Sequence, residues 1–370
     1  MLALTPHTVM RILCVSTPVG FLGSGEGGGL ELTVRNVVHS LSDRNHSITI
    51  IAPQGSQSAH GQVIEVGGEP PPLAQLCERT TPVSINAGSV LGRMWEVARE
   101  LQSEFDILLN FAYDWLPFYL TPFFHRPVAH LVCMGSLSTV MDEVINAVAL
   151  RYPGTIAVRT RAQAQTFPFA SSCRCLPNGL DLTLYQCNLY PQEYLGWMGR
   201  ISPEKGLEDA IAAVNKTQIP LKIWGKLQNS DYWQWIKAQF PSAPFSYEGF
   251  LPTSALQEEL GKCRGLLMTH RWVEAFGNVC IEALACGVPV IAYSRGGPSE
   301  IVHSGKTGWL VEPDSVNGLV EAIAKLGQIN RSHCREEAEA SYSLAGLGER
   351  FETWLNDCLA KHSGAKLPLG

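Results

Sequence analysis

Short apolar segments alternate with amphipathic helical segments along the first half of the chain, and this alternation constrains the fold more than any other feature. Apolar residues fill 11–17 (RILCVST) and 47–53 (SITIIAP), and segment 32–45 between them places its apolar residues approximately on one helical face. Segments 105–112 (FDILLNFA) and 127–134 (PVAHLVCM) continue the pattern. Strands joined through helices pair in parallel. The sequence therefore predicts an α/β fold with a parallel sheet.

The pattern starts again in the second half of the chain. Residues 194–201 (YLGWMGRI) open a second series of strands and helices, and segment 177–186, which contains Pro and Gly, precedes this restart and places the boundary near residue 188. A chain of 370 residues suits two domains of roughly 150 to 200 residues each. Ligands of such folds bind beyond the carboxyl ends of the strands, so we expect a cleft where two sheets face each other. The expected parts are two Rossmann-like domains, 1–188 and 189–342, and a C-terminal helix with a tail, 343–370.

Composition excludes several classes of protein. The chain is 45% hydrophobic and only 17% charged, which is typical of a compact globular protein. Its net charge of -6, without a run of basic residues, disfavours nucleic acid and membranes as partners. No apolar segment reaches the ~18 residues that span a bilayer, and the first residues lack a secretory signal, so a cytoplasmic location is expected. The eleven cysteines form no Cys-x-x-Cys pair, which favours reduced core thiols over a metal or disulfide framework.

Two glutamates flank a glycine turn in segment 272–301 (WVEAFGNVCIEALACGVPVIAYSRGGPSEI). The pattern predicts a strand over 265–270, a loop, and a helix that starts around Gly277 or Asn278. The start of a helix binds anions, and glycine lets a phosphate approach closely. Glu274 precedes this helix and Glu282 lies inside it, on the order of 10 Å away. The expected ligand is therefore elongated, with hydroxyls at both ends and an anion in the middle, as in a sugar nucleotide. The alternative is that both glutamates are ordinary solvated helix residues.

At these residues the sequence resembles the retaining glycosyltransferases of family 4, which have the two-Rossmann GT-B fold. The resemblance extends over most of the chain through GRISPEKG (199–206), PNGLD (177–181) and YEGF (247–250). It implies that the N-terminal domain binds the acceptor, that the C-terminal domain binds the nucleotide sugar, and that the C-terminal helix crosses back to the N-terminal domain.

The same resemblance assigns roles to individual residues. It implies that Glu274 contacts the donor sugar, that Glu282 contacts the ribose, and that Arg200 and Lys205 contact the diphosphate. The residues between the two glutamates are expected to complete the donor site: Phe276, Gly277 and Asn278. Two cations at the diphosphate are what a metal-free site needs, and the chain contains no Asp-x-Asp. We therefore expect no metal and no cofactor besides the donor substrate UDP-glucose. Surface solubility is the alternative role for Arg200 and Lys205.

A glycine-rich segment over 23–31 (GSGEGGGLE) contains a formal G-x-G-x-x-G. A nicotinamide dinucleotide site would require these glycines to follow the first strand closely and an acidic residue to end the second strand. Five residues intervene instead, and the second strand ends Ala52-Pro53-Gln54. The resemblance implies another role, in which the backbone amides of Gly27 and Gly28 face the donor diphosphate.

The acceptor is sought in two neighbouring segments. Residues 111–125 (FAYDWLPFYLTPFFH) contain seven aromatic side chains, and 134–143 (MGSLSTVMDE) ends in two acids. Aromatic rings stack on a flat heterocycle, and carboxylates accept from its donor edge. The candidate acceptor-binding residues are Asp114, Trp115, Met134, Asp142 and Glu143. The alternative is that at least four of the aromatic side chains are core residues and that the acids are solvated.

These segments are similar to cyanobacterial glucosyltransferases that transfer glucose from UDP-glucose to tetrahydrobiopterin, which implies a reduced pterin as the acceptor. Two positions depart from the family. His130 lies three residues upstream of the point where a histidine is usual, which favours a strand residue over a sugar ligand, and His270 replaces a small residue near the donor. Other functions remain open: a nucleotide-sugar epimerase, a transferase acting on a lipid or glycan, or a nucleotide-sugar-binding protein without turnover.

Overall fold

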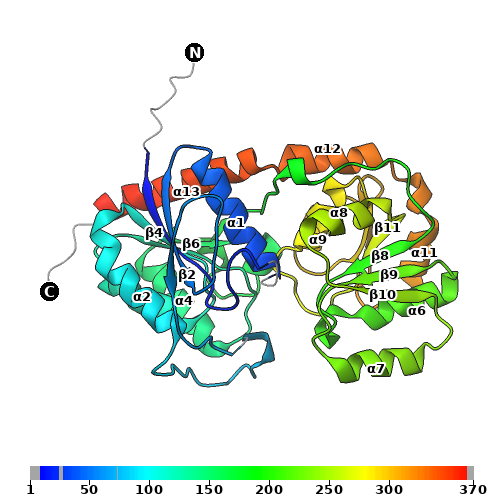
Figure 1. The fold of residues 1–370 in the computed structure, drawn as a ribbon, viewed down its shortest axis with the longest axis horizontal. Helices are drawn as coiled ribbons and strands as arrows, with labels where there is room; N and C mark the ends of the chain where they lie inside the picture. Colours follow the sequence, from blue (N-terminus) through cyan, green and yellow to red (C-terminus); the bar gives the residue numbers. More distant parts are fainter. Residues whose placement is uncertain (1–8, 25–27, 73, 365–370) are drawn as a thin grey trace, which may run out of the picture. The chain divides into compact units, whose positions relative to one another are not determined.

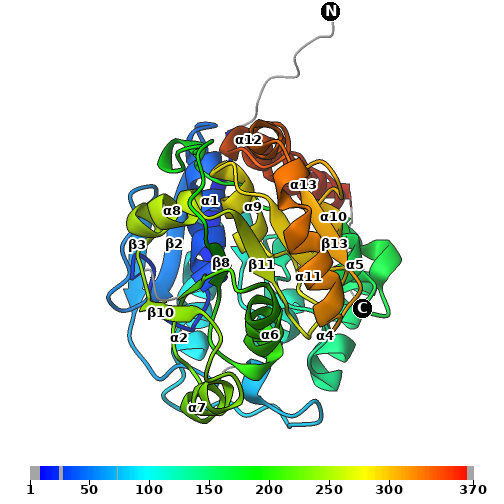
Figure 2. The same ribbon diagram turned by 90° about the vertical axis from the view of Figure 1, so that its right-hand side faces the viewer.

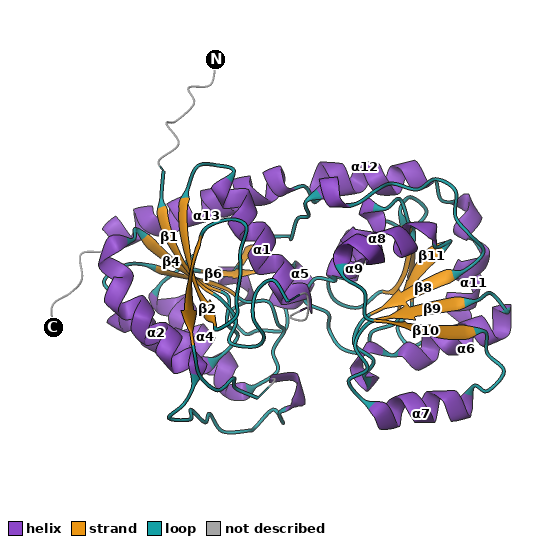
Figure 3. Cartoon of the chain, viewed as in Figure 1, coloured by secondary structure: helices purple, strands orange, loops and turns teal. Residues whose placement is uncertain are grey.

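The computed structural model describes residues 9–24, 28–72 and 74–364. The chain folds into two compact units: unit 1 comprises Met1–Pro177 with Leu344–Gly370, and unit 2 comprises Asn178–Ser343. Each unit contains one parallel sheet between helices (Figures 1 and 3). The α/β fold with two Rossmann-like parallel sheets, predicted from the alternation of strands and helices, is confirmed.

The division lies slightly before the boundary expected near residue 188, because the segment after Pro177 packs onto unit 2. The backbone amide of Gln186 donates to Gln257 Oε1 (3.1 Å), and the amide of Asn188 donates to the carbonyl of Cys286 (3.0 Å). Residues 178–188 therefore belong to the second unit.

Unit 1 has a seven-stranded sheet with the order β3-β2-β1-β4-β5-β6-β7, and every pairing is parallel. Its strands are β1 (Arg11–Val15), β2 (Ser47–Pro53), β3 (Gln62–Val66), β4 (Ile107–Asn110), β5 (Val128–Leu131), β6 (Ile156–Val158) and β7 (Arg174–Cys175). Its helices are α1 (Gly28–Ser42), α2 (Val90–Leu101), α3 (Trp115–Leu120), α4 (Thr139–Arg151), α5 (Arg161–Ala164) and α13 (Leu344–Gly364).

Strand β1 is buried on both faces, which explains its continuous apolar sequence. Successive side chains of a strand point to opposite faces. Ile12 and Cys14 pack in the core that contains α1 and α13, whereas Leu13 and Val15 pack in the core that contains α2. The sheet of unit 1 therefore separates two apolar layers.

Helix α13 completes the first of these layers. Leu347, Phe351, Trp354 and Leu355 are buried there beside the apolar face of α1, and Trp354 Nε1 donates to the carbonyl of Gly154 (2.8 Å). Figure 1 shows α13 beside α1. The expectation that the C-terminal helix returns to the first half of the chain is confirmed.

Unit 2 has a six-stranded parallel sheet with the order β10-β9-β8-β11-β12-β13. Its strands are β8 (Leu195–Met198), β9 (Leu221–Trp224), β10 (Phe245–Gly249), β11 (Gly265–Met268), β12 (Val290–Tyr293) and β13 (Gly308–Val311). Its helices are α6 (Leu207–Thr217), α7 (Ser230–Gln239), α8 (Thr253–Lys262), α9 (Asn278–Ala285), α10 (Pro298–Ile301), α11 (Val316–Ala324) and α12 (Arg331–Ser341). Helices α6 and α11 contact each other, and α9 contacts α8 and α12 (Figure 2).

No helix within the described ranges is both long and apolar enough to cross a membrane.

Candidate functional site

The loop between β11 and α9 carries the first of the two glutamates. Helix α9 begins at Asn278, directly after Gly277, as predicted. Gly277 has a φ of +98°, and a Cβ atom there would lie 3.1 Å from Met268 Cε and 3.2 Å from Pro298 Cγ. The backbone conformation therefore favours glycine, and a side chain there would also press on Met268 and Pro298. Asn278 Oδ1 accepts a hydrogen bond from Nδ2 of the buried Asn178 (2.7 Å), which ties the start of the helix to the PNGLD segment.

Glu274 is held by two donors in this loop. Its Oε2 accepts from Lys205 Nζ (2.7 Å) and from Trp272 Nε1 (3.0 Å), and the same lysine lies 4.5 Å above the centre of the Trp272 ring. The carboxylate side chain is only 16% exposed. Burial by itself raises the pKa of Glu274, but the charge of Lys205, the neighbouring His270 and the two hydrogen bonds lower it below its usual value. Glu274 is therefore a fixed, ionised carboxylate.

Lys205 reaches Glu274 because a short 3-10 helix, η6 (Pro203–Lys205), lies against the end of β11. The η6 helix ends at Gly206, whose φ is +63° and whose Cβ, if present, would lie 2.1 Å from the Thr269 carbonyl oxygen. Thr269 Oγ1 donates to the Gly206 carbonyl (2.7 Å), and the Arg271 amide donates to the Glu204 carbonyl (2.8 Å). The glycine that ends GRISPEKG thus permits the contact between the two loops.

A pair of glycines supports the same loop from the other side. The Gly297 amide donates to the Glu274 carbonyl (2.7 Å). A Cβ on Gly296 would lie 2.4 Å from the Glu274 carbonyl oxygen, and a Cβ on Gly297 would lie 2.2 Å from that of Phe276. Real Cβ atoms do not approach so closely, so only glycine fits at both positions. The sequence displays this Gly-Gly but does not reveal that its neighbour is Glu274.

Glu282 lies inside α9 and is buried, with 8% of its surface exposed. Its Oε1 accepts a hydrogen bond from the Tyr185 hydroxyl (3.1 Å), from the segment that follows PNGLD. Glu282 is therefore not an ordinary solvated helix residue. Phe276 is also buried and packs edge-on against Tyr342, so this side chain contributes to the core.

Arg200 has different partners from those of Lys205, although both belong to GRISPEKG. Its Nη1 donates to Gln228 Oε1, and its Nη2 lies 3.2 Å from Glu204 Oε1. The structure thus brings Lys205 and Glu274 together, and it places Arg200 in a second polar group with Glu204 and Gln228.

His270 is almost fully buried beneath this loop. Its Nε2 lies 2.6 Å from the Arg295 carbonyl, which makes Nε2 the protonated nitrogen. Burial lowers the pKa of His270, although Glu274 and the bond to Arg295 act in the opposite direction. The imidazole is therefore neutral at neutral pH.

A polar network anchors Arg271, the residue after His270. Its Nη2 lies 2.9 Å from both Glu208 Oε1 and Asp209 Oδ1, and Asp209 Oδ2 accepts from the Tyr293 hydroxyl (2.8 Å). Sequence reasoning missed Arg271, Trp272 and Tyr185. Of these three residues, only Trp272 could have been identified as a site residue from the sequence, because it lies two residues before Glu274.

In the glycine-rich segment, Gly28 is the first residue of α1, and Gly27 lies outside the described residues. Gly28 has a φ of +62°, and a Cβ built on it meets no atom within 4 Å. Glu31 accepts from the Gly23 amide (2.8 Å) and from Ser24 Oγ (3.1 Å), and thereby links residues 23 and 24 to α1. There is thus open space at the position where a side chain of residue 28 would begin.

The acceptor candidates have local structural roles. Asp114 caps α3 by accepting from the Leu116 amide (3.2 Å), and burial raises its pKa. Trp115 stacks on Tyr119 with ring centres 4.3 Å apart. Among the seven aromatic side chains of 111–125, Tyr119 and Phe123 are exposed, whereas three are fully buried and two pack partly buried against the core: Phe111, Phe118, Phe124, Tyr113 and Trp115. His130 is a buried residue of β5, as its position favoured.

The second acceptor segment is similarly engaged. Asp142 Oδ2 lies 2.7 Å from Arg79 Nη2 and accepts from Ser136 Oγ at the same distance. Met134 Sδ accepts from Gln75 Nε2 (3.7 Å), and Glu143 is exposed on α4. Arg79 and Gln75 come from the long segment between β3 and α2, which the sequence reading left unassigned.

Comparison with known proteins finds similarity to one family over part of the chain. Residues 190–341 match the family model of glycosyl transferases group 1. This segment carries Arg200, Lys205, Glu274 and Glu282 and makes up most of unit 2.

Two curated relatives match a shorter part of the chain. Sucrose synthase from Solanum tuberosum is 38% identical over 102 residues, which is 27% of this chain and 12% of that protein. Probable sucrose-phosphate synthase 1 from Oryza sativa subsp. indica is 32% identical over 97 residues, 26% of this chain and 9% of that protein. The chain thus spans only about a tenth of the length of these relatives.

Two solved structures share the fold over nearly the whole chain. The Anabaena protein HepE, solved with UDP and glucose, is 19% identical with a TM-score of 0.74, covering 94% of this chain and 99% of that one. Sucrose-phosphate synthase from Thermosynechococcus elongatus is 18% identical with a TM-score of 0.74, covering 95% of this chain and 99% of that one. The chain therefore shares the fold of these two structures, with one parallel-sheet α/β domain in each unit.

Proposed function

We propose that this protein is a glycosyltransferase that transfers glucose from UDP-glucose to a small acceptor with retention of configuration. The observation that carries the proposal is the Glu274 carboxylate, fixed by Lys205 directly before the start of α9, inside a segment of the group 1 glycosyl transferase type. HepE, which shares the fold, was solved with UDP and glucose, and sucrose synthase is a sequence relative.

The donor residues have distinct roles in this proposal. The positive end of the α9 dipole, beside Gly277, attracts the diphosphate, and Lys205 and Arg200 neutralise the charge that develops on the departing UDP. Glu282 accepts hydrogen bonds from the ribose hydroxyls and is oriented by the Tyr185 hydroxyl. Glu274 accepts from a hydroxyl of the sugar and holds it in place for the transfer. In the resemblance to family 4, the leaving phosphate takes the proton of the acceptor hydroxyl on the same face, which gives retention.

Metal independence is part of the same proposal. The resting ion pair between Lys205 and Glu274 keeps a cation at the site before the donor binds. Arg200 supplies a second cation from the same segment. Two cations meet the electrostatic demand of a departing diphosphate that a divalent ion meets elsewhere.

For the acceptor we propose the side-chain hydroxyl of a reduced pterin such as tetrahydrobiopterin. The support is the resemblance in segments 111–125 and 134–143, together with the stacked rings of Trp115 and Tyr119 beside the partly buried Asp114. Asp142 is paired with Arg79, so binding a pterin through Asp142 requires this pair to open or to be shared. A lipid or glycan acceptor is the principal alternative.

The proposal is tested by measuring whether the protein turns over UDP-glucose. Purified protein is incubated with UDP-glucose and, in separate reactions, with tetrahydrobiopterin under reducing conditions, an oligosaccharide, a lipid acceptor and buffer alone, and UDP and glucosylated products are measured. We expect UDP release and a glucosylated pterin. The variant Glu274→Gln, which removes the charge and keeps the shape, is the matched control.

Each other outcome selects an alternative. Transfer only to a lipid or oligosaccharide overturns the pterin proposal and leaves the glycosyltransferase proposal standing. Conversion of the sugar without UDP release identifies an epimerase. A thermal shift with UDP-glucose but no product in any reaction identifies a binding protein without turnover.

A further inference from the structure

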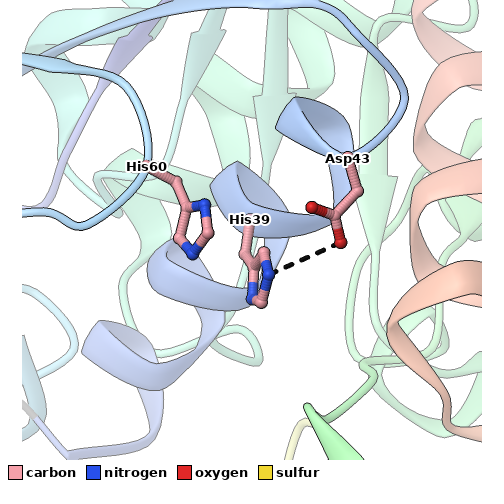
Figure 4. Close-up of side chains that lie close together, drawn as sticks. All are labelled: His39, Asp43 and His60. Atoms are coloured by element: carbon pink, nitrogen blue, oxygen red, sulfur yellow. Dashed lines mark ion pairs between the residues drawn. The ribbon is translucent and has the colours of Figure 1, made fainter.

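Three side chains with metal-binding atoms lie together in unit 1: His39, Asp43 and His60 (Figure 4). One ligand atom of each lies within 4.8 Å of the others. His39 Nε2 is 3.4 Å from Asp43 Oδ2, and the rings of His39 and His60 stack with centres 3.7 Å apart. These residues play no part in the proposed donor or acceptor sites.

Two separate elements position these side chains. His39 lies on α1, and Asp43 directly follows the helix with its amide still donating to the His39 carbonyl (3.0 Å). This bond keeps the spacing of four residues that places two side chains on one helical face. Figure 4 shows both side chains pointing to the same side of α1.

The third side chain comes from the loop between β2 and β3. Ser58 Oγ donates to the His60 carbonyl (2.5 Å) and lies 3.2 Å from the His60 amide, which closes a tight turn. Gly61 follows with a φ of +80°, and a Cβ there would lie 2.9 Å from the Ile48 carbonyl oxygen. The loop is therefore held against β2, and His60 is presented toward α1.

The spacing suits a small divalent ion. Zinc binds imidazole nitrogen and carboxylate oxygen at ~2.0 to 2.2 Å in a tetrahedron, so neighbouring ligand atoms lie about 3.3 to 3.5 Å apart. The His39–Asp43 separation of 3.4 Å falls in this range. Imidazole nitrogens bind a metal in the plane of the ring, so the stacked rings of His39 and His60 must turn about their side-chain bonds for both to bind one ion.

We propose that His39, Asp43 and His60 bind one divalent transition-metal ion of the zinc type, with two imidazole nitrogens, one carboxylate oxygen and an open fourth position for water. The ion links the end of α1 to the loop between β2 and β3 and so stabilises unit 1. None of these three residues is a donor or acceptor candidate, and the donor candidates other than Gly27 and Gly28 belong to unit 2.

The test uses the full chain, freed of metal and titrated with Zn²⁺ by calorimetry and with Co²⁺ by visible spectroscopy. We expect one ion per chain, a Co²⁺ spectrum of nitrogen and oxygen ligands without thiolate charge transfer, and a higher Tm when Zn²⁺ is present. His39→Ala and His60→Ala are expected to weaken binding by at least ~10-fold and to abolish the rise in Tm. His333→Ala, which changes an exposed histidine on α12, is the control and is expected to bind as the unchanged protein does.

Asp43→Asn guards against misfolding of the alanine variants, because it changes an exposed carboxylate to an amide of the same shape. A protein that binds no Zn²⁺ overturns the proposal. So does equal binding by all the variants, or a Co²⁺ spectrum dominated by thiolate, because the ion would then lie at the cysteines.

Discussion

In unit 2 the proposed donor carboxylate is held from three sides, whereas in unit 1 the acids proposed for the acceptor serve the local fold. Lys205, Trp272 and the Gly296–Gly297 pair fix Glu274 and its loop. Asp114 caps a helix and Asp142 pairs with Arg79. The side chain proposed to bind the donor sugar is thus already held in place, whereas the acids proposed to bind the acceptor already bind other groups of unit 1.

The largest effect is expected in the core that α13 shares with α1. Trp354→Ala removes a buried indole and its hydrogen bond to Gly154, so unit 1 should lose about 3 to 5 kcal/mol of unfolding free energy. Deleting residues from 343 onward should give insoluble or inactive protein. The matched control is Trp235→Ala, a half-exposed tryptophan on α7 of unit 2. Hydrogen exchange measured by mass spectrometry reports each unit separately, and a soluble, fully active truncation would contradict the essential role of α13.

The second prediction distinguishes the roles within the donor site. Glu282→Ala and Arg200→Ala should weaken donor binding, and Glu274→Ala should mainly lower turnover. Each loses a charge-assisted hydrogen bond that contributes roughly 1.5 to 3 kcal/mol, equivalent to about 10- to 150-fold. Steady-state kinetics with UDP-glucose give the separate effects on KM and kcat. Unchanged kinetics in all three variants would contradict the site assignment. If Asp114→Ala lost as much activity as the donor-site variants, the contrast between the two units would not hold.

The third prediction concerns acid and unit 1. Burial lowers the pKa of His130 from 6.5 to about 3. Between these values the unfolded chain binds a proton that the folded chain does not, so this contribution to stability is complete above pH 6.5 and is lost as the pH falls. At pH 5 the loss is about 2 kcal/mol. His130→Gln should flatten the pH dependence of hydrogen exchange in unit 1 and leave unit 2 unchanged. An identical pH dependence in the variant would show that His130 is not the responsible group.

The smallest expected effect is that of a chelator. Activity should persist in excess EDTA, because we propose Arg200 and Lys205 as the cations at the diphosphate. The same treatment should lower the Tm of unit 1 if it strips the ion from His39, Asp43 and His60. Loss of activity with EDTA, followed by recovery with magnesium or manganese, would refute metal-independent transfer.

The sequence predicted those features that depend on neighbours along the chain. The start of α9 follows from Gly277 and the apolar pattern after it, and β1 follows from its continuous apolar residues. Contacts between distant segments were not predictable in this way. Tyr185 reaches Glu282 from 97 positions away, and the steric need for Gly296 arises only from Glu274 beside it. Likewise, the observed unit boundary differs from the predicted one because residues 178–188 form hydrogen bonds with distant residues of unit 2.

The packing of α13 also bears on how the chain folds during synthesis. Unit 1 needs Leu347, Phe351 and Trp354 to complete its core, and these residues are translated after the whole of unit 2. At roughly 5 to 20 residues per second, α13 follows Pro177 by about 10 to 30 seconds. Unit 2 has all its residues at the end of that interval, whereas the nascent first half still exposes the apolar face of α1. The half of the protein that is made first is therefore the half that finishes folding last, and it is the half that a chaperone would need to protect on the ribosome.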